Sequence, residues 1–352
     1  MRTGILTFHR SRNYGAVLQA YALCSVLNDL GIETDIIDYK CDKIEENLKL
    51  WNPKENKIKA ILRFAFRYRK KKVFDSFDKK FLKKSNEKNI QNISIMDVLN
   101  QYDTIVVGSD QVWCERITGN DKTYLLQDVK KKKIAYAASV GDTIDISKNT
   151  LECIDSFDHV SVREEKFGKL LRNNGIENSV CCDPTVLAGV DYFEQIVARR
   201  IYKQKYVFVF MIWNSPQLLS NAKKFAEIKG LKLISSKESF EFFLHCKPTE
   251  FLSWIKNAEY VFTNSFHGTV FSLLFHKKFI SSICKASGEK NLRVQEFLTS
   301  LRCTNNILSN EEVQIQQITE PDYDIVERNM LAMRKKSIDY LKKAFDIIER
   351  DN

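Results

Sequence analysis

The sequence has no apolar run long enough to cross a membrane as a helix. The longest, YVFVFMIW at 206–213, has the length of a buried strand, whereas a spanning helix needs about 20 apolar residues. The N-terminus has only a short apolar stretch before His9 and Arg10, so we do not expect a signal peptide. With 44% hydrophobic and 28% charged residues, the composition also argues against a disordered, collagen-like or coiled-coil chain. We therefore expect a globular protein of the cytoplasm.

Cysteine and histidine do not recur at metal-ligand spacing. The nine cysteines are an odd number and form no CxxC pair. Cys24, Cys181 and Cys182 lie in apolar segments, where a thiol usually acts as a small hydrophobic group. We expect the cysteines to be reduced and structural, and a metal or redox role is the alternative. Three histidines without a partner at ligand spacing are also expected to be structural: His159, His245 and His276.

Several motifs of common enzyme classes are missing. The chain contains no GxSxG, Walker loop, HExxH or DxD pair. It also lacks GxGxxG after its first strand, which argues against a dinucleotide cofactor.

The 352 residues suggest two domains of an α/β protein. Strand-like and helix-like segments alternate from residue 3 to about 183 and again from about 205, which predicts two doubly wound, Rossmann-like domains facing a cleft. We expect an N-terminal domain over 1–195, with a basic helical insert at about 45–90, and a C-terminal domain over 196–320. The final segment, 321–352, is expected to be a helix that crosses back to the first domain.

The net charge of +10 favours anionic partners. A strongly basic helical stretch, Lys57–Lys84, contains Phe74, Phe77 and Phe81 at helical spacing, and we expect these rings to pack against the domain. The stretch is either a solvated face or a surface that contacts nucleic acid or anionic lipid.

In a doubly wound sheet, ligands bind beyond the carboxyl ends of the strands, and TNSFHG at 263–268 lies at such a position. The segment follows a predicted strand, Tyr260–Thr263, and opens an apolar helix predicted over Gly268–Phe275, whose N-terminus suits phosphate or carboxylate. Gly268 would let the backbone approach a ligand, and His267 can exchange a proton near neutral pH. The alternative is that Ser265 only caps the helix and His267 is a structural loop residue.

Three further charged residues lie at or near strand ends. Arg163 follows a strand and could hold an anion, or could pair with a neighbouring glutamate. Arg293 has the same two interpretations, and its helical context favours a surface pair. Asp110 could be a general base or could cap the turn that follows it.

A polar loop follows the first predicted strand. Asn13, Tyr14, Gly15 and Gln19 lie where this strand turns into its helix, which is where a doubly wound fold places a ligand loop.

Taken in order, these motifs resemble the polysaccharide pyruvyl transferase family. The resemblance runs from about residue 4 to 302 and rests on the following segments: GILTFHRSRNYGAVLQAYAL, VVGSDQVW, IAYAASVG, VSVREEKFGKLL, CDPT, TNSFHGTVFSLLF and NLRVQEFLTSLR. It implies two Rossmann-like domains as in GT-B glycosyltransferases. It also implies transfer of the pyruvyl group of phosphoenolpyruvate (PEP) to a sugar, giving a cyclic ketal on a cell-surface polysaccharide precursor such as that of a capsule or exopolysaccharide.

The resemblance also implies roles for individual residues. His267 would be the catalytic acid, and Asp110 is our second catalytic candidate. The predicted PEP-binding residues are Arg163, Arg293, Ser265 and Gly268. The predicted acceptor side comprises Asn13, Tyr14, Gly15 and Gln19. No metal or other cofactor is required.

The acceptor is expected to be a lipid-linked or nucleotide-linked saccharide, and a peripheral contact with the inner membrane surface is an additional prediction. No nucleic-acid partner is expected. The rival functions are a GT-B glycosyltransferase that uses a nucleotide sugar, and a basic anion-binding protein without catalysis.

Overall fold

A computed structural model describes residues 2–50, 57–85, 95–142, 146–283, 291–309 and 318–347, except the side chains of 57–63. The chain divides into two compact units. The first unit comprises Met1–Ala188 and Met333–Asn352, and the second comprises Gly189–Ala332. The 86–90 part of the predicted basic insert lies outside the described residues, as does 51–56.

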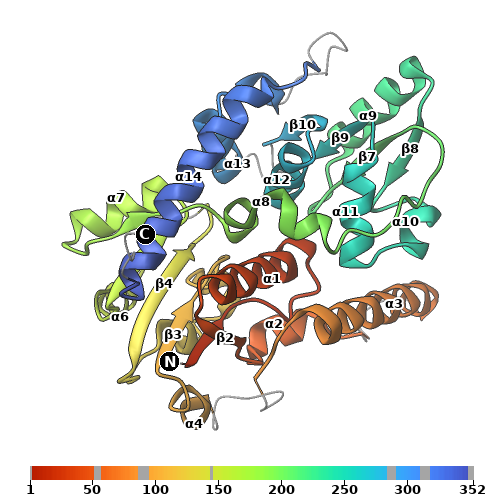
Figure 1. Cartoon of the computed structure of the whole chain (residues 1–352). Helices are drawn as coiled ribbons and strands as arrows, with labels where there is room; N and C mark the ends of the chain where they lie inside the picture. Colours follow the sequence, from red (N-terminus) through yellow and green to blue (C-terminus); the bar gives the residue numbers. More distant parts are fainter. Residues whose placement is uncertain are drawn as a thin grey trace. The chain divides into compact units, whose positions relative to one another are not determined.

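The first unit is built on a six-stranded parallel sheet with the order β2-β1-β3-β4-β5-β6 (Figure 1). Its strands are β1 (Arg2–Leu6), β2 (Glu33–Ile36), β3 (Thr104–Val107), β4 (Lys132–Ala138), β5 (His159–Val162) and β6 (Ser179–Val180). The flanking helices are α1 (Tyr14–Asp29), α2 (Asp42–Asn47), α3 (Lys57–Phe81), α4 (Ile95–Leu99), α5 (Glu115–Thr118), the short 3-10 helix η1 (Lys122–Leu125), α6 (Lys148–Asp155), α7 (Glu165–Asn173) and the start of α8 (Pro184–Glu194).

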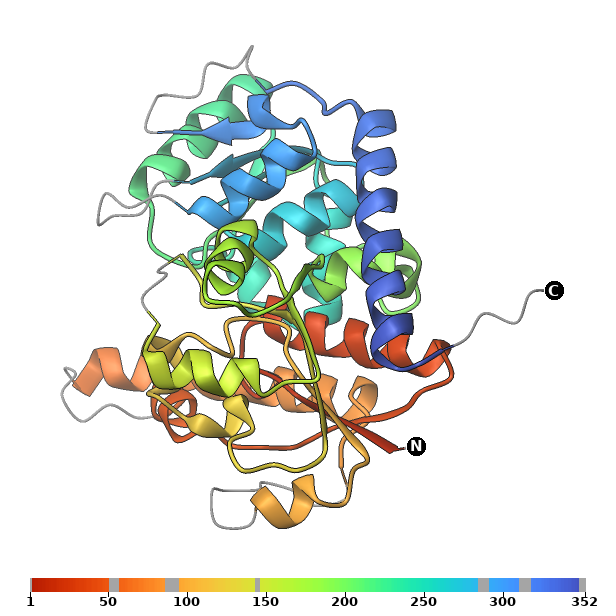
Figure 2. The ribbon, with the colours of Figure 1, turned by 90° about the vertical axis from the view of Figure 1, so that its left-hand side faces the viewer.

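The second unit is built on a five-stranded parallel sheet with the order β11-β10-β9-β7-β8. Figure 1 labels β10, β9, β7 and β8 in this order, and Figure 2 gives a second view of the chain. Its strands are β7 (Tyr206–Phe210), β8 (Lys232–Ser235), β9 (Tyr260–Thr263), β10 (Lys278–Ser282) and β11 (Ile307–Leu308). The helices are α9 (Pro216–Lys229), α10 (Phe240–Leu244), α11 (Pro248–Lys256), α12 (Phe266–Leu274), α13 (Leu292–Ser300), the 3-10 helix η2 (Thr304–Asn306) and the start of α14 (Tyr323–Ala344).

The strands are apolar because both faces of a parallel sheet are covered by crossover helices. In β3 (TIVV) and β7 (YVFVF) every residue is buried, with no alternation of polar side chains. Each central strand therefore contributes side chains to two layers of core, and polar groups are left for the ends of the strands.

The two sheets have the same topology. With strands numbered by their order in the chain, the first sheet has the order 2-1-3-4-5-6. If β7 to β11 are renumbered 1 to 5 and the second sheet is listed from β8, its order is 2-1-3-4-5. In such sheets the strand order reverses between the first and third strands, and the ligand crevice lies beyond the carboxyl ends at that point. This rule selects the segments after β1 and β3 in the first unit, and those after β7 and β9 in the second.

The chain leaves the first unit inside α8 and returns inside α14. The kink in α8 is at Gly189, where the backbone has φ 74°, a conformation that glycine adopts most easily. Ser337 Oγ in α14 accepts a hydrogen bond from the Cys182 backbone N–H at 3.0 Å, and the Tyr340 hydroxyl donates to the Ala135 carbonyl in β4 at 2.8 Å. The last part of α14 therefore completes the first unit.

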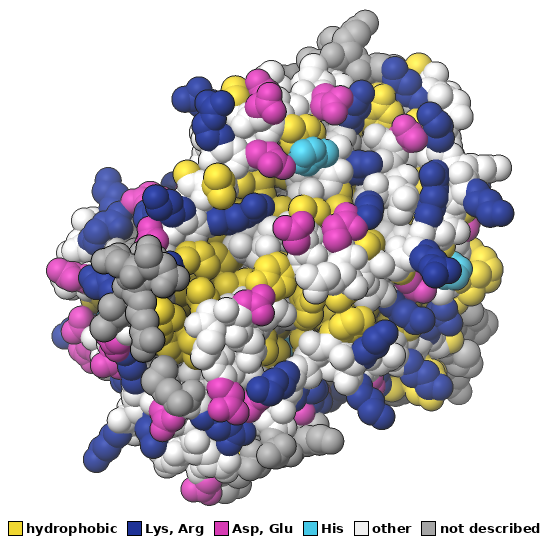
Figure 3. Space-filling model, viewed as in Figure 1, with side chains coloured by type: hydrophobic (Ala, Val, Ile, Leu, Met, Phe, Trp, Pro, Cys, Tyr) yellow, Lys and Arg dark blue, Asp and Glu magenta, His cyan; other side chains and the backbone are white. Residues whose placement is uncertain are grey.

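The basic insert contains α3, a helix of 25 residues. In the space-filling view of Figure 3, which has the orientation of Figure 1, Lys and Arg side chains gather at the lower right, where Figure 1 shows α3. None of the helices in the described part of the chain is long and apolar enough to cross a membrane.

Of the three cysteines expected in apolar segments, Cys24 and Cys181 are buried and Cys182 is partly buried. Burial raises the pKa of the Cys24 thiol to about 11, so this group is protonated and unreactive at neutral pH.

Candidate functional site

The carboxyl edge of the second sheet is held together by Asn264. Its Oδ1 accepts a hydrogen bond from the Ile212 backbone N–H at 2.9 Å, and its Nδ2 donates to the Trp213 carbonyl at 3.2 Å. Asn264 follows β9, whereas Ile212 and Trp213 follow β7, so one buried amide links the two loops at the point where the strand order reverses. The loop geometry at the predicted ligand crevice of this unit is therefore fixed by a side chain.

The helix α12 starts at this edge, and Ser265 caps it. Ser265 Oγ accepts a hydrogen bond from the Gly268 backbone N–H at 3.2 Å, so the capping role considered from the sequence is observed. The helix begins at Phe266, two residues before the predicted start. His267 consequently lies in the first helical turn, is only 9% exposed, and packs edge-to-face against the ring of Phe266.

Gly268 has a packing reason to be glycine. A Cβ atom at this position would lie 2.4 Å from Oγ1 of Thr263, at the end of β9. That hydroxyl is held in place, because it donates to the Phe210 carbonyl and accepts from the Ser265 backbone N–H. Because glycine has no side chain, α12 can begin directly against the sheet. This packing explains why residue 268 is glycine, and no ligand is needed to explain it.

Arg293 is brought to the same edge by Asn291. Asn291 is fully buried and immediately precedes α13, and its Nδ2 donates to the Asn264 carbonyl at 3.3 Å. The ring of Phe297 in α13 contacts that of Phe266 in α12, with centroids 5.3 Å apart. The structure thus places the first turns of α12 and α13, with His267 and Arg293, beside one loop.

In the first unit, the four predicted acceptor-side residues form the start of α1. Asn13 caps the helix, since its Oδ1 accepts from the Gly15 backbone N–H at 2.9 Å, and its own side chain is exposed. Tyr14 is buried against Phe74 of α3, with ring centroids 5.0 Å apart. Gln19 is fully buried and donates to Thr7 Oγ1 at 2.8 Å. Of the three side chains in this set, that of Asn13 is the best placed to meet a ligand.

Sequence reasoning missed a buried charge network behind this loop. The imidazole of His9 is inaccessible to solvent, and its Nε2 lies 2.9 Å from Oδ1 of Asp38. Asp38 also pairs with Arg10 at 2.9 Å and with Lys84 at 3.6 Å. Burial alone would raise the pKa of Asp38, but hydrogen bonds and the positive charges of these partners outweigh it and hold the pKa below its ordinary value. The carboxylate therefore joins the loop after β1 to the end of the basic insert.

This network predicts a pH dependence of stability. Because the pKa of Asp38 is lower in the folded chain, its contribution is complete above the unfolded pKa of about 4 and is lost as the pH falls below it toward the folded value. We expect Asp38→Asn to lower the free energy of unfolding by roughly 2–3 kcal/mol at pH 6 and by less at about pH 2.5, between the unfolded and folded pKa values. Urea unfolding at the two pH values measures the difference.

The matched control for this experiment is Asp97→Asn, since Asp97 is exposed in α4 of the same unit. It should leave stability nearly unchanged at both pH values. A cost of Asp38→Asn that is equal at pH 6 and at about pH 2.5 would show that the charge of Asp38 is not what stabilises the network.

Asp110 adopts a left-handed backbone conformation just after β3, with φ 73°. Its Oδ1 accepts a hydrogen bond from the Gln111 backbone N–H at 2.9 Å, and its carbonyl accepts from Val112 and Ser139. Of the two interpretations of Asp110 from the sequence, the structure therefore shows the capping of the turn that follows it. Its carboxylate is partly exposed at the carboxyl edge of the first sheet.

Arg163 lies in a buried ion-pair cluster at the end of β5. Its side chain is 4% exposed; Nε donates to Glu164 at 3.0 Å and Nη1 donates to Asp183 at 2.8 Å. Burial lowers the pKa of the guanidinium, but the two carboxylates raise it above its ordinary value. Of the two alternatives left by the sequence, the pair with a glutamate is therefore observed, although it is buried and not on the surface.

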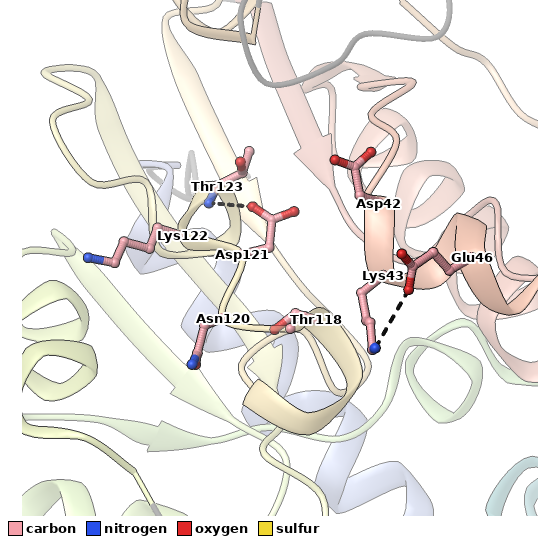
Figure 4. A pocket seen from close by; sticks show the side chains of 9 residues that line it. Asp42, Lys43, Glu46, Thr118, Asn120, Asp121, Lys122 and Thr123 are labelled. Atoms are coloured by element: carbon pink, nitrogen blue, oxygen red, sulfur yellow. Dashed lines mark hydrogen bonds and ion pairs between the residues drawn. The ribbon is translucent and has the colours of Figure 1, made fainter.

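A polar cavity of about 640 Å³ lies in the first unit beside α2 (Figure 4). One wall comes from α2, which follows β2, and the other from the loop around α5 and η1, which follows β3. Figure 4 shows Asp42 and Asp121 on opposite sides of this space, with Lys43 paired to Glu46 at 3.6 Å. The lining residues are Asp42, Lys43, Glu46, Thr118, Gly119, Asn120, Asp121, Lys122 and Thr123.

The cavity is lined by carboxylates, hydroxyls, ammonium groups and the amide of Asn120, and none of its lining residues has a hydrophobic side chain. Such a lining suits a ligand with many hydroxyl groups, which needs both donors and acceptors. The sequence signal for it was weak, because its two walls are separated by about seventy residues and neither contains a motif. Within the described residues, no group of three or more His, Cys, Asp or Glu side chains is placed to hold a metal ion.

The two parallel sheets with flanking helices define a GT-B fold, the class predicted from the sequence. The chain is similar to UDP-GlcNAc 2-epimerase from Neisseria meningitidis bound to UDP-GlcNAc, with a TM-score of 0.55 and 10% identity over 98% of this chain and 100% of that one. It is also similar to UDP-GlcNAc 2-epimerase from Methanocaldococcus jannaschii in complex with UDP-GlcNAc and UDP, with a TM-score of 0.52 and 15% identity over 98% and 99%. These similarities show the fold.

The family is shown by sequence. The model of the polysaccharide pyruvyl transferase family matches residues 13–283, so the chain belongs to that family and is a transferase. No curated protein matches the chain in a sequence comparison. The family is the one that the motifs predicted, and its members modify polysaccharides, which implies a sugar acceptor.

Proposed function

We propose that the protein transfers the pyruvyl group of PEP to a sugar of a cell-surface polysaccharide precursor, forming a cyclic ketal. The observation that carries this proposal is the position of His267. Its family motif lies at a helix N-terminus, beyond the strand end where a doubly wound sheet binds ligands. A proton donor beside a helix N-terminus suits a substrate that is anionic and must be protonated.

In the proposed reaction, His267 gives a proton to the methylene carbon of PEP. The adjacent C2 becomes electrophilic, and a sugar hydroxyl attacks it and forms the first C–O bond. The bond from C2 to the phosphate oxygen breaks, inorganic phosphate leaves, and a second hydroxyl of the sugar closes the ketal. Both hydroxyls lose their protons: one proton restores His267, and the other is taken up by a base, for which we propose the partly exposed Asp110, and leaves with the phosphate.

The second unit is proposed to bind PEP. Ser265 caps α12 and Gly268 lies in its first turn, where backbone dipoles favour an anion, and Arg293 supplies a cation from α13. The guanidinium of Arg163, which was predicted to bind PEP, already binds two carboxylates, and their negative charges disfavour an anionic ligand beside it. We propose instead that Arg163 positions the loop between β5 and α7.

The first unit is proposed to bind the acceptor, with Asn13 at the start of α1 and the polar cavity beside α2 as the binding groups. If Asp42 and Asn120 bond to sugar hydroxyls, the double variant Asp42→Ala/Asn120→Ala should raise the KM for the acceptor at least tenfold, since each lost bond costs about 1 kcal/mol or more. The KM for PEP should stay the same. Initial rates over both substrate concentrations give the two values.

The control for the cavity is Asp97→Ala/Asn100→Ala. These residues are of the same types, are exposed in and after α4 of the same unit, and do not line the cavity. The control should leave both KM values unchanged. If the cavity variant also leaves the acceptor KM unchanged, the acceptor binds elsewhere.

The reaction itself is tested by incubation of the full chain with PEP and a panel of UDP-sugars and lipid-linked saccharides. We expect PEP-dependent release of phosphate, together with a product whose mass has increased by one ketal-linked pyruvate. The competing function is glycosyl transfer from a nucleotide sugar. Release of nucleotide from a UDP-sugar without PEP, and no ketal product, would favour it.

The site of action follows from the same proposal. We propose that the protein acts in the cytoplasm. A soluble acceptor can be modified there directly, whereas a lipid-linked acceptor requires the protein to work at the inner surface of the cell membrane. The panel above separates the two kinds of acceptor.

A further inference from the structure

The excess positive charge of this protein is concentrated in one helix. Helix α3, Lys57–Phe81, contains ten basic and two acidic residues and carries a formal charge of +8. The rest of the chain has 45 basic and 43 acidic residues, a charge of only +2. The net charge of +10 is therefore a property of α3 and not of the whole surface.

One face of α3 fixes the helix to the first unit. Phe74 and Phe77 are buried, and their rings contact those of Tyr14 and Tyr21 on α1, with centroids 5.0 and 6.5 Å apart. The sequence predicted this packing from the spacing of the phenylalanines. These two rings anchor the second half of the helix.

The opposite face of α3 carries aromatic and basic side chains that are exposed. Phe64 and Tyr68 are one helical turn apart, are 39% and 43% exposed, and stack with ring centroids 6.0 Å apart. Lys72, one further turn along, places its Nζ over the Tyr68 ring at 4.8 Å. Phe66 is also exposed, at 42%, although it lies on the same side of the helix as Phe77. Large aromatic side chains are thus held out of the core beside clustered cations.

We infer that α3 is a membrane-surface helix that binds anionic lipid headgroups through its basic side chains and inserts Phe64 and Tyr68 at the interface. Aromatic rings are favoured at the boundary between headgroups and acyl chains, and each Lys or Arg near an anionic surface adds attraction. Single-stranded nucleic acid can also stack on aromatic rings beside cations, but Phe64 and Tyr68 already stack on each other, and the apolar surface that they expose together suits the headgroup boundary. This inference does not depend on the reaction proposed above.

The test is co-sedimentation of the full chain with vesicles of phosphatidylcholine, with or without about 30% phosphatidylglycerol. We expect binding only to the anionic vesicles, and weaker binding when the salt concentration is raised from about 0.05 to about 0.5 M. Lys72→Gln/Lys79→Gln/Lys80→Gln removes three exposed cations of α3 and should lower the partition coefficient about 100-fold. Phe64→Ala/Tyr68→Ala keeps every charge and should lower it roughly tenfold.

The matched control is Lys223→Gln/Lys224→Gln/Lys229→Gln, which removes the same charge from exposed positions of α9 in the second unit. It should bind anionic vesicles as the unmodified chain does. Equal losses in the α3 and α9 charge variants would overturn the inference, because binding would then follow net charge alone. Binding to duplex or single-stranded DNA without binding to vesicles would overturn it in favour of a nucleic-acid surface.

Discussion

Replacement of His267 with alanine is expected to lower turnover at least 100-fold. A positioned acid typically contributes about 10²–10⁴-fold in rate, which is roughly 3–5 kcal/mol of barrier. The fold should remain intact, because alanine is the best helix former and the position lies in the first turn of α12. Steady-state release of phosphate from PEP in the presence of acceptor measures the loss, and circular dichroism checks the fold.

His276→Ala is the control for this measurement. The imidazole of His276 is half exposed in the same unit, stacks on Tyr323 and pairs with Glu327 at 2.7 Å, so its loss should leave turnover nearly unchanged. A His267→Ala variant with normal turnover would remove His267 from the mechanism. The remaining acid candidates would then have to come from a different part of the fold.

Replacement of Arg163 with alanine is expected to lower the free energy of unfolding by about 3–5 kcal/mol. The guanidinium lies between Glu164 and Asp183, and both carboxylates are almost fully buried. Without the guanidinium, two negative charges remain in a site that excludes water. Removing one partner of a buried ion pair therefore destabilises the fold more than replacing the whole pair would, because the other charge is left buried without a partner. Urea unfolding measures the loss.

Arg172→Ala provides the comparison. Arg172 pairs with Glu165 on the same helix, but both side chains are exposed, so the variant should lose less than about 1 kcal/mol. The measurement also separates the two roles considered for Arg163. An Arg163→Ala variant with normal stability and weakened PEP binding would assign Arg163 to the donor site and refute the positioning role.

The strands and most helices could be predicted from the sequence because their signals are local. His159–Val162 and Tyr260–Thr263 were predicted with their observed bounds, since short runs of buried β-favouring residues end at polar segments. The start of α12 was predicted two residues too late. The capping bond from Gly268 to Ser265 places Phe266 and His267 inside the helix, although neither is a typical signal for a first turn.

The tertiary contacts at the strand ends could not be predicted in the same way. His9 and Asp38 are 29 residues apart, and nothing in the periodicity of either segment indicates that they pair. The steric reason for Gly268 was likewise hidden, because it depends on the rotamer of Thr263 in a different element. The sequence places these segments at the carboxyl ends of the strands, as observed, but a residue at a strand end can equally support the loop or contact a ligand.

The return of the chain into the first unit constrains how the protein can fold as it is made. Leu341 and Ala344 are fully buried, and Tyr340 bonds to β4, yet these residues are synthesised more than 140 residues after Ala188. A ribosome therefore completes the whole second unit before the first can close its core. Nascent chains that stall before residue 333 would expose apolar surface of the first sheet, which makes them natural targets for chaperones and proteases.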